Sequence, residues 1–396
     1  MRKLFLLITM ILVIQTIVAP KIYGESSSPS LHSEAAILLE ANSDKILYEK
    51  NAKKLMYPAS VTKIATAIYA IENGNLEDVI TVSKAASAKN VEGTTVFLEE
   101  GEQVTLKKLI QGLLINSGND AGIAIAEHLS GNVERFSDDL NTYLTKVIGT
   151  EQTNFENPHG LFDENHVTTA KDLAKITQHA MKNEEFKEIF GTKEMDWVGE
   201  TWETKLRTHH KLVKDEIPYE GITGGKNGFV SRSGYTLVTT AERDGLNLVA
   251  VTLKGSLDDE VYDDTIELLD YGFENFMTTS IDKGSIYNVG EQEYIAPEKL
   301  VFTHRPEAKL NETLKQDGTL EIVSQNETIA EFELEKVDKG SSKVEPKQAS
   351  GKTQATILAT IFSVFPYLSL VFAISIVSIV IVWIRKKSIR RNKYYF

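Results

Sequence analysis

The sequence predicts an α/β protein in which a sheet flanked by helices, with a helical subdomain, is followed by a small β-rich domain and a C-terminal transmembrane helix. Strand candidates flank a block with helical apolar spacing in the larger N-terminal part of the chain, an order typical of layered α/β folds. Short strand candidates then alternate with turns between residues 284 and 337. A long uncharged apolar segment lies close to the C-terminus.

Length and composition limit the possible functions. At 396 residues the chain exceeds a typical single domain, and its hydrophobic fraction of 42% is ordinary for a folded protein. The formal net charge is −13, and basic residues at the two ends leave the middle still more acidic, which disfavours nucleic-acid binding. The absence of cysteine excludes disulfides, zinc–thiolate sites, iron–sulfur clusters and a cysteine nucleophile.

The N-terminus has the pattern of a secretory signal peptide, predicted at residues 1–24. Arg2 and Lys3 precede an apolar run that extends to about Ala19, and the small residue Gly24 offers a cleavage position. A buried N-terminal helix is the alternative. The signal-peptide pattern predicts that the protein is secreted across the membrane.

The C-terminus has the pattern of a membrane anchor. A flexible linker is predicted at residues 338–354 and a transmembrane segment at residues 355–384. Residues 365–384 alone are long enough to cross a hydrocarbon layer of roughly 30 Å as a helix. A basic tail at residues 385–396 marks the cytoplasmic side. These features predict a single pass through the cell membrane, with the body of the protein on the extracytoplasmic side.

Apolar spacing places the first elements. Residues 34–49 read as a hairpin. Residues 60–73 have helical spacing that ends at Gly74. Further helices are predicted at residues 106–114, 121–129 and 170–183.

Beyond residue 221 the pattern changes to strands. Residues 236–240 and 246–253 read as adjacent strands, and residues 265–276 return to helical spacing. In the small β-rich domain at residues 284–337, the clearest strand candidates are residues 319–323 and 329–334.

The first chemical motif is the pair Ser60 and Lys63. Ser60 opens the helix predicted at residues 60–73, and side chains at this spacing lie on one face of a helix. A lysine whose pKa is lowered by burial can take the proton of a serine hydroxyl, and the helix N-terminus favours the negative charge that develops there. Taken alone, the pair is explained more simply by a capping serine and a surface lysine.

The second motif, Ser117 and Asn119, lies in a turn expected between two apolar helices. A serine and an asparagine held on one loop can relay a proton and bind a substrate amide. Because loops commonly contain Ser, Gly and Asn, this pair is a weak signal by itself.

The third motif, Lys226-Asn227-Gly228, follows two glycines and precedes the predicted strand pair. Glycines let the backbone approach a ligand closely, and Lys226 can hold an anionic group. Taken alone, such a segment is a hairpin turn more often than a site.

In this order the three motifs resemble those of penicillin-binding proteins and β-lactamases. The flanking residues 57–64, 113–121 and 157–161 are similar to the low-molecular-weight penicillin-binding proteins of the D-alanyl-D-alanine carboxypeptidase family. The resemblance covers residues 34–276 and extends more loosely to residue 337. It implies a β-lactamase/transpeptidase-like fold, with a penicillin-binding peptidase domain at residues 25–283.

The resemblance also implies a reaction, the removal of the terminal D-alanine from the peptidoglycan stem pentapeptide. Ser60 is the implied nucleophile, Lys63 the general base and Ser117 the proton relay. The implied substrate-binding residues are Asn119, Lys226, Asn227, Gly228 and Phe229. The backbone N–H groups of Ser60 and Phe229 would form the oxyanion hole. No metal or organic cofactor is implied, and β-lactams would acylate Ser60.

Two positions depart from the family pattern. Asn227 stands where the family usually has a threonine, whose hydroxyl contacts the terminal carboxylate of the substrate. By an ungapped count, Val261 falls where the family commonly has an arginine for the same carboxylate, and Arg232 is a candidate substitute. A lost charge-assisted contact costs roughly 1.5–3 kcal/mol, so we expect a slow or altered carboxypeptidase.

Two other functions stay open at this point. A non-catalytic peptidoglycan-binding scaffold that kept the fold is suggested by the altered carboxylate site. A β-lactamase is the third possibility, although no segment clearly matches the glutamate-bearing loop of the class A enzymes. His209 and His210 raise the question of a metal, but no motif such as His-Glu-x-x-His accompanies them, so no metal site is predicted.

Overall fold

The computed structural model describes residues 28–337 of the chain. The predicted signal peptide, linker, transmembrane segment and basic tail all lie outside these residues. Within residues 28–337, no helix is both long enough and apolar enough to span a bilayer.

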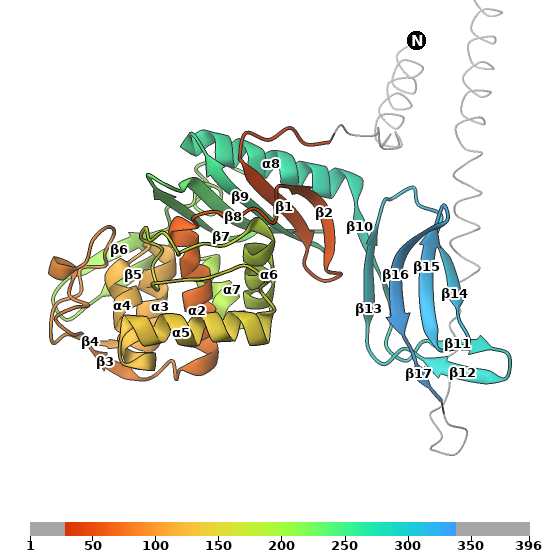
Figure 1. The fold of residues 1–396 in the computed structure, drawn as a ribbon, viewed down its shortest axis with the longest axis horizontal. Helices are drawn as coiled ribbons and strands as arrows, with labels where there is room; N and C mark the ends of the chain where they lie inside the picture. Colours follow the sequence, from red (N-terminus) through yellow and green to blue (C-terminus); the bar gives the residue numbers. More distant parts are fainter. Residues whose placement is uncertain (1–27, 338–396) are drawn as a thin grey trace, which may run out of the picture. The chain divides into compact units, whose positions relative to one another are not determined.

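An antiparallel sheet lies at the centre of residues 35–275 (Figure 1). It has five strands in the order β2-β1-β9-β8-β7. The strands are β1 (Ala35–Glu40), β2 (Lys45–Lys50), β7 (Ile222–Val230), β8 (Gly234–Arg243) and β9 (Leu246–Gly255). The predicted N-terminal hairpin is confirmed, and it pairs through β1 with the much later β9. Because β7 is at the sheet edge, one side of its backbone is not covered by another strand of the sheet.

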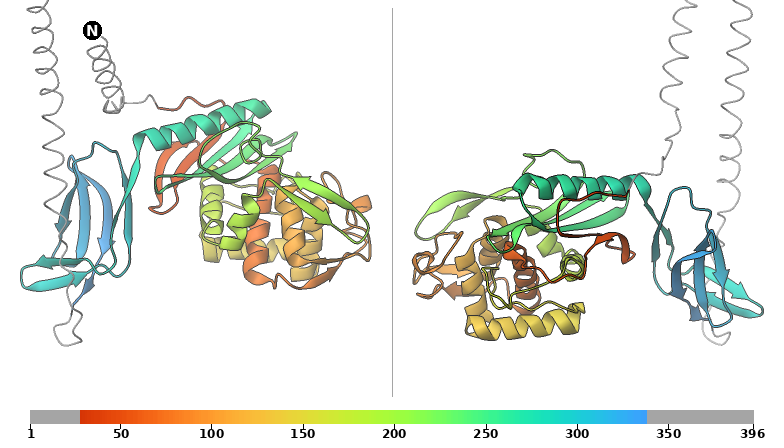
Figure 2. Two further views of the ribbon diagram at one scale, coloured as in Figure 1. Left: turned by 180° about the vertical axis from the view of Figure 1, so that it is seen from behind. Right: turned by 45° about the horizontal axis from the view of Figure 1, so that its top comes forward.

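Helices cover both faces of this sheet (Figure 2). Helix α8 (Asp258–Asn275) lies on one face, and the remaining helices form a block on the other. Alternate residues of β1 enter the two cores: Ile37 packs into the helical block and Leu38 into the cluster under α8. Burial on both faces explains why β1 reads as a continuous apolar run instead of an alternating one.

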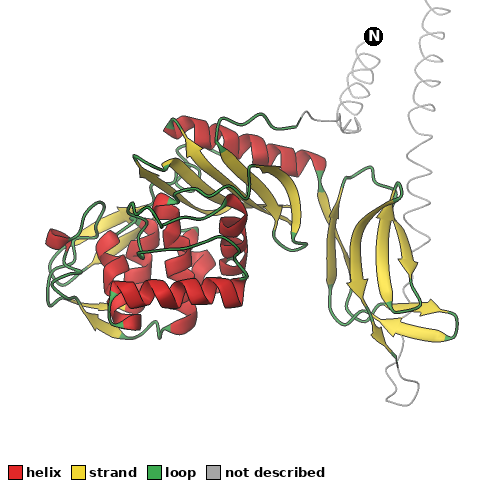
Figure 3. Cartoon of the chain, viewed as in Figure 1, coloured by secondary structure: helices red, strands yellow, loops and turns green. Residues whose placement is uncertain are grey.

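The helical block is drawn in red in Figure 3. Its helices are α2 (Lys63–Asn73), α3 (Leu106–Ile115), α4 (Asn119–Ser130), α5 (Val133–Tyr143), α6 (Ala170–Ala180) and α7 (Glu184–Phe190). Polar caps fix several of the starts, because a side-chain oxygen accepts a hydrogen bond from an otherwise unpaired backbone N–H. Thr105, Asn132, Thr169 and Asn183 cap α3, α5, α6 and α7 in this way.

The helices predicted within residues 28–337 are present, with shifted ends. Helix α8 begins at Asp258 instead of residue 265, because its acidic first turn is stabilised at a helix N-terminus. The Glu260 carboxylate accepts the backbone N–H of Leu257 at 3.1 Å. Helices α5 and α7 were not predicted. Two hairpins were also missed: β3 (Val79–Thr81) with β4 (Gln103–Thr105), and β5 (Glu194–Val198) with β6 (Glu203–Arg207).

The rest of the described chain is built from strands, which include those predicted at residues 319–323 and 329–334. They are β10 (Met277–Ile281), β11 (Ile286–Val289), β12 (Gln292–Ile295), β13 (Leu300–His304), β14 (Asn311–Leu314), β15 (Thr319–Ser324), β16 (Glu327–Glu333) and β17 (Glu335–Lys336). The chain divides into two compact units. Among the described residues, one unit contains residues up to 283 together with 296–335, and the other contains residues 284–295, 336 and 337.

Candidate active site

Ser60 lies on a tight turn at the start of the helical block. It belongs to the short 3₁₀ helix η1 (Ala59–Thr62), which runs directly into α2. Ala59 has a left-handed φ of 51°, and the Thr62 hydroxyl donates to the Ala59 carbonyl at 2.9 Å. The Thr62 hydroxyl also lies 2.8 Å from Nε2 of the buried His166. These contacts fix the segment that carries Ser60.

Lys63 is fully buried beside Ser60. Its Nζ lies 3.0 Å from Ser60 Oγ and 2.6 Å from the His159 carbonyl oxygen, to which it donates. Burial, and then the charge of Lys226, hold the pKa of Lys63 well below the ordinary lysine value, while the Asp120 carboxylate opposes them. A neutral amine at this distance can take the proton of the serine hydroxyl.

Ser117 and Asn119 lie where α3 turns into α4. Ser117 has a left-handed φ of 65° and is only 5% exposed. The Asn119 backbone N–H donates to the Thr94 carbonyl and its side-chain amide to the Glu92 carbonyl, both at 2.7 Å. The hydrogen bonds found among residues 28–337 do not join Ser117 to Ser60 or Lys63.

Lys226 and its neighbours form part of edge strand β7 and not the turn that is the commoner explanation of such a segment. Their regular pairing with β8, in which Lys226 lies opposite Val238, explains this difference. Lys226 is 3% exposed and donates to the Asn227 carbonyl at 2.8 Å. Burial lowers the pKa of Lys226 to about 7.

Strand β7 lies directly against the Ser60 turn. A Cβ at Gly228 would lie 2.6 Å from the Ser60 backbone nitrogen, so only glycine allows this approach. The Thr236 hydroxyl, on the neighbouring strand, donates to the Pro58 carbonyl at 2.9 Å and strengthens the contact. Gly228 and Lys226 face the helical block, whereas Asn227 and Phe229 alternate to the α8 side.

A further loop, at residues 158–160, packs against the turn that carries Ser60. The site residues assigned from the sequence did not include it. The His159 carbonyl accepts from Lys63, and the Thr66 hydroxyl donates to the Pro158 carbonyl at 2.7 Å. Gly160 has a φ of 88°, and a Cβ on it would lie 1.9 Å from the Ala59 carbonyl oxygen. The signal that could have found this loop is the proline and glycine on either side of His159.

Residues 23–256 match a family model described as D-alanyl-D-alanine carboxypeptidase. The chain belongs to this D-alanyl-D-alanine carboxypeptidase family. The family resemblance inferred from the three motifs is therefore confirmed.

Relatives and solved structures agree with this assignment. The D-alanyl-D-alanine carboxypeptidase DacF of Bacillus subtilis (strain 168) is 32% identical over 266 residues, which covers 66% of this chain and 67% of DacF. Penicillin binding protein 5 from Haemophilus influenzae is 26% identical with a TM-score of 0.71, covering 79% of this chain and 98% of that one. Penicillin binding protein 6B from Escherichia coli is 26% identical with a TM-score of 0.66, covering 78% and 96%. The mixed α/β fold of these proteins is thus confirmed for this chain.

In this carboxypeptidase, Val261 stands where the ungapped count places the family's arginine. Val261 is 1% exposed and packs with Leu212 and Tyr262 at the start of α8. A Cβ at Gly255 would lie 2.4 Å from its Cγ1, so the side chain is closely surrounded. The nearby Lys211 ammonium is already paired with two carboxylates, at 2.7 Å from Asp258 and 2.6 Å from the next residue. The first turns of α8 therefore place a buried apolar side chain at the position that the ungapped count assigns to the family's arginine.

The two adjacent histidines of this carboxypeptidase differ in their surroundings. His210 is fully buried behind β7, where its Nε2 lies 2.9 Å from the Thr239 hydroxyl. His209 is exposed, and desolvation, followed by the charge of Lys226, lowers its pKa to about 4. Within residues 28–337, no cluster of His, Cys, Asp and Glu side chains has an arrangement that could hold a metal.

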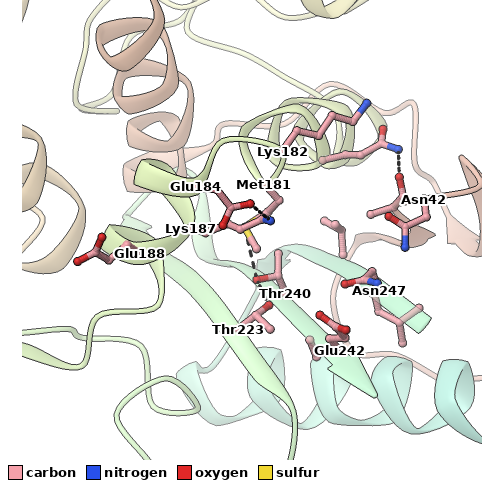
Figure 4. Close-up of a pocket in the computed structure, with 15 residues that line it drawn as sticks. Asn42, Met181, Lys182, Glu184, Lys187, Glu188, Thr223, Thr240, Glu242 and Asn247 are labelled. Atoms are coloured by element: carbon pink, nitrogen blue, oxygen red, sulfur yellow. Dashed lines mark hydrogen bonds and ion pairs between the residues drawn. The ribbon is translucent and has the colours of Figure 1, made fainter. Parts of the chain in front are cut away.

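A separate cavity lies away from the motif residues of this carboxypeptidase (Figure 4). It has a volume of about 580 Å³ and is lined by α6, α7 and the ends of β7, β8 and β9. Its polar contacts are internal: Lys187 pairs with Glu184 at 2.6 Å, and the Thr223 hydroxyl donates to that of Thr240 at 2.8 Å. None of the motif residues lines it.

Proposed function

We propose that this chain is an active serine-type D-Ala-D-Ala carboxypeptidase, which trims the terminal D-alanine of peptidoglycan stem pentapeptides through an acyl-enzyme on Ser60. The observation that carries the proposal is the buried Lys63 Nζ, 3.0 Å from the Ser60 hydroxyl. Membership of the D-alanyl-D-alanine carboxypeptidase family supports the choice of substrate.

In this mechanism Lys63 takes the hydroxyl proton as Ser60 Oγ attacks the carbonyl carbon of the penultimate D-alanine. The peptide C–N bond then breaks as Ser117 gives its hydroxyl proton to the nitrogen of the departing D-alanine and takes up the proton that Lys63 carries, which leaves Lys63 neutral again. Water attacks the resulting ester, again with Lys63 as base, and Ser60 is regenerated. Each step uses only this chain's side chains and water.

The negative charge on the attacked carbonyl oxygen is assigned to two backbone donors. Gly228 packs against the Ser60 nitrogen, and this contact supports the assignment of the Ser60 N–H and the N–H of the next residue, Phe229, as the two donors. Preorganised donors of this kind contribute about 3–4 kcal/mol each in serine hydrolases.

The remaining motif residues are assigned to substrate binding. The side chain of Asn119, held by its bond to the Glu92 carbonyl, orients the substrate peptide. Lys226 supplies positive potential to the terminal carboxylate. Asn227 stands where the family usually has a hydroxyl for this carboxylate, but its side chain alternates to the α8 side of β7. With Val261 apolar and buried, this carboxylate has fewer partners than the family pattern provides.

A labelled penicillin tests the proposal most directly. We expect the full-length chain to form a stable covalent adduct and the Ser60→Ala variant to form none. Ser280→Ala, on the exposed part of strand β10, is the matched control and should label like the wild type. No labelling of the wild type would favour the non-catalytic scaffold. Rapid loss of the label with turnover of the antibiotic would favour a β-lactamase.

The Asn227→Thr variant tests the altered carboxylate site. We expect it to raise kcat/KM for release of D-alanine from a pentapeptide by about tenfold, because it restores the hydroxyl that the family usually has at this position. Asn227→Ala, which supplies no donor, should not show this gain. Wild-type turnover at the rates usual for the family would refute the idea that the enzyme is slow.

We also propose an export route and a membrane anchor. Residues 1–24 act as the signal peptide and residues 355–384 as a single C-terminal pass, with residues 25–283 as the peptidase domain outside the cytoplasm. The charge pattern at the two ends supports this topology. The penicillin-labelled band should remain with the membrane fraction and become soluble when the chain ends at residue 337. A soluble full-length band would contradict the anchor.

A further inference from the structure

Arg232 lies on a rigid turn at the end of edge strand β7. The turn is closed by Ser233, whose backbone N–H donates to the Val230 carbonyl at 3.0 Å. The Ser233 hydroxyl also accepts from the Val230 N–H at 3.1 Å and donates to the Gly234 carbonyl at 2.7 Å. The exposed Arg232 is therefore carried by a well-fixed backbone.

Two aromatic rings lie between the Arg232 guanidinium and the turn that carries Ser60. The Arg232 Cζ lies 5.9 Å from the ring centroid of Phe162, and Phe162 makes an edge contact with Tyr57 at 5.0 Å. Tyr57 leads into the Ser60 turn, and Phe162 follows the Gly160 loop that packs on the same turn. A cation over an aromatic face is attracted to it and kept in place.

Arg232 and Lys226 lie on opposite sides of Ser60. Gly228 is the residue of β7 that packs against the Ser60 nitrogen. At about 3.3 Å per residue, Lys226 is about 7 Å before this point, and Val230, the last residue of β7, is about 7 Å beyond it, where the turn with Arg232 begins. The proposed function places the terminal carboxylate toward Lys226, so the acyl half of the peptide must extend toward Arg232.

The Arg232 guanidinium is available for a ligand. Among the ion pairs of residues 28–337, none involves Arg232. A cavity of about 590 Å³ beside it is lined also by Phe229, Lys50 and Lys254. The one carboxylate of that lining, Glu34, is already paired with Lys254 at 2.7 Å and with a second lysine. The lining of this cavity thus carries a net positive charge, although the protein is acidic overall.

We infer that Arg232, held over Phe162, binds a carboxylate on the acyl half of the stem peptide, upstream of the bond that is cut. Arg232 is then a specificity-determining residue, and the enzyme prefers substrates with a negative charge upstream over those with a positive charge. This inference rests on the proposed function. The sequence alone had made Arg232 a candidate for binding the terminal carboxylate. The inference assigns Arg232 to a different carboxylate, on the acyl half.

Three matched peptides test this inference: acetyl-Gly-X-D-Ala-D-Ala with X as L-Glu, L-Gln or L-Lys. For the full-length wild type we expect kcat/KM to be about fivefold higher for the Glu than for the Lys peptide, mainly through KM, because one partly exposed charge contact is involved. In Arg232→Gln this ratio should fall to about one, with little change for the neutral Gln peptide. Arg232→Glu should reverse the order.

The control variant is Arg135→Gln, which removes an exposed arginine from α5 and should keep the wild-type ratio. Equal hydrolysis of all three peptides by the wild type would overturn the inference while leaving the proposed function intact. A preference that survives in Arg232→Gln would also overturn it. Failure of the wild type to hydrolyse any peptide would overturn the proposed function and this inference together.

Discussion

Replacing Lys63 by methionine should slow acylation of the enzyme by about a thousandfold, because a positioned general base typically contributes 10²–10⁴ to the rate. Methionine fills a similar volume but has no amine to take the Ser60 proton, which Lys63 Nζ can reach at 3.0 Å. The rate constant for labelled-penicillin adduct formation and the release of D-alanine from a pentapeptide would measure the loss.

The same substitution should change how stability depends on pH. Burial, followed by the charge of Lys226, holds the pKa of Lys63 well below 10.5 in the folded protein. Between that folded pKa and about 10.4, the unfolded chain therefore binds one more proton at this residue. Stability rises with pH in such a window. The wild-type free energy of unfolding should therefore increase, through Lys63, by as much as about 1.4 kcal/mol per pH unit. The Lys63→Met variant should lack this gain.

Denaturant unfolding at about pH 7.5 and 9.5 would show the difference in slope. Lys89→Met, which removes an exposed lysine, is the control and should keep both the wild-type rate and the wild-type slope. Acylation within tenfold of the wild type would assign the base to another group. An unchanged slope would mean that Lys63 stays charged in the folded enzyme.

Local signals in the sequence predicted the elements with strong periodicity. The hairpin of β1 and β2 and helices α2, α3 and α4 follow from apolar spacing and turn residues. Helix α5 was missed although its signal is present, since Phe136, Leu140 and Tyr143 recur at helical spacing after the capping Asn132. Its many polar residues concealed the pattern.

Sequence spacing could not predict how the motifs come together. The expectation that the three motifs share one site rested on the family resemblance. Ser60 and Lys226 approach each other only because β7 joins the far edge of a sheet that also contains β1. The His159 carbonyl, which accepts from Lys63, was missed for a related reason: a backbone oxygen leaves no residue-type signature. The direction in which Arg232 lies from Ser60 likewise follows only from the register of β7.

Substituting Gly160 by alanine should have the second large effect, on both stability and activity. A Cβ at this position would lie 1.9 Å from the Ala59 carbonyl oxygen and 3.0 Å from the Ser60 nitrogen. Both are backbone atoms, so relieving the clash moves the Gly160 loop and the turn that carries Ser60 relative to each other. Overpacking of this kind costs about 1–3 kcal/mol, and the left-handed φ of 88° adds about 1 kcal/mol.

The displacement should reduce acylation by about a hundredfold, since a shift of about 1 Å in a catalytic group has an effect of that size. Penicillin acylation rates and thermal unfolding would measure the two losses separately. Gly131→Ala is a matched control, because Gly131 has a nearly identical φ of 89° with no atom within 4 Å of the added Cβ. It should show the backbone strain of about 1 kcal/mol without any loss of acylation. Equal behaviour of the two variants would show that the Gly160 loop does not position Ser60, because strain alone would then account for both.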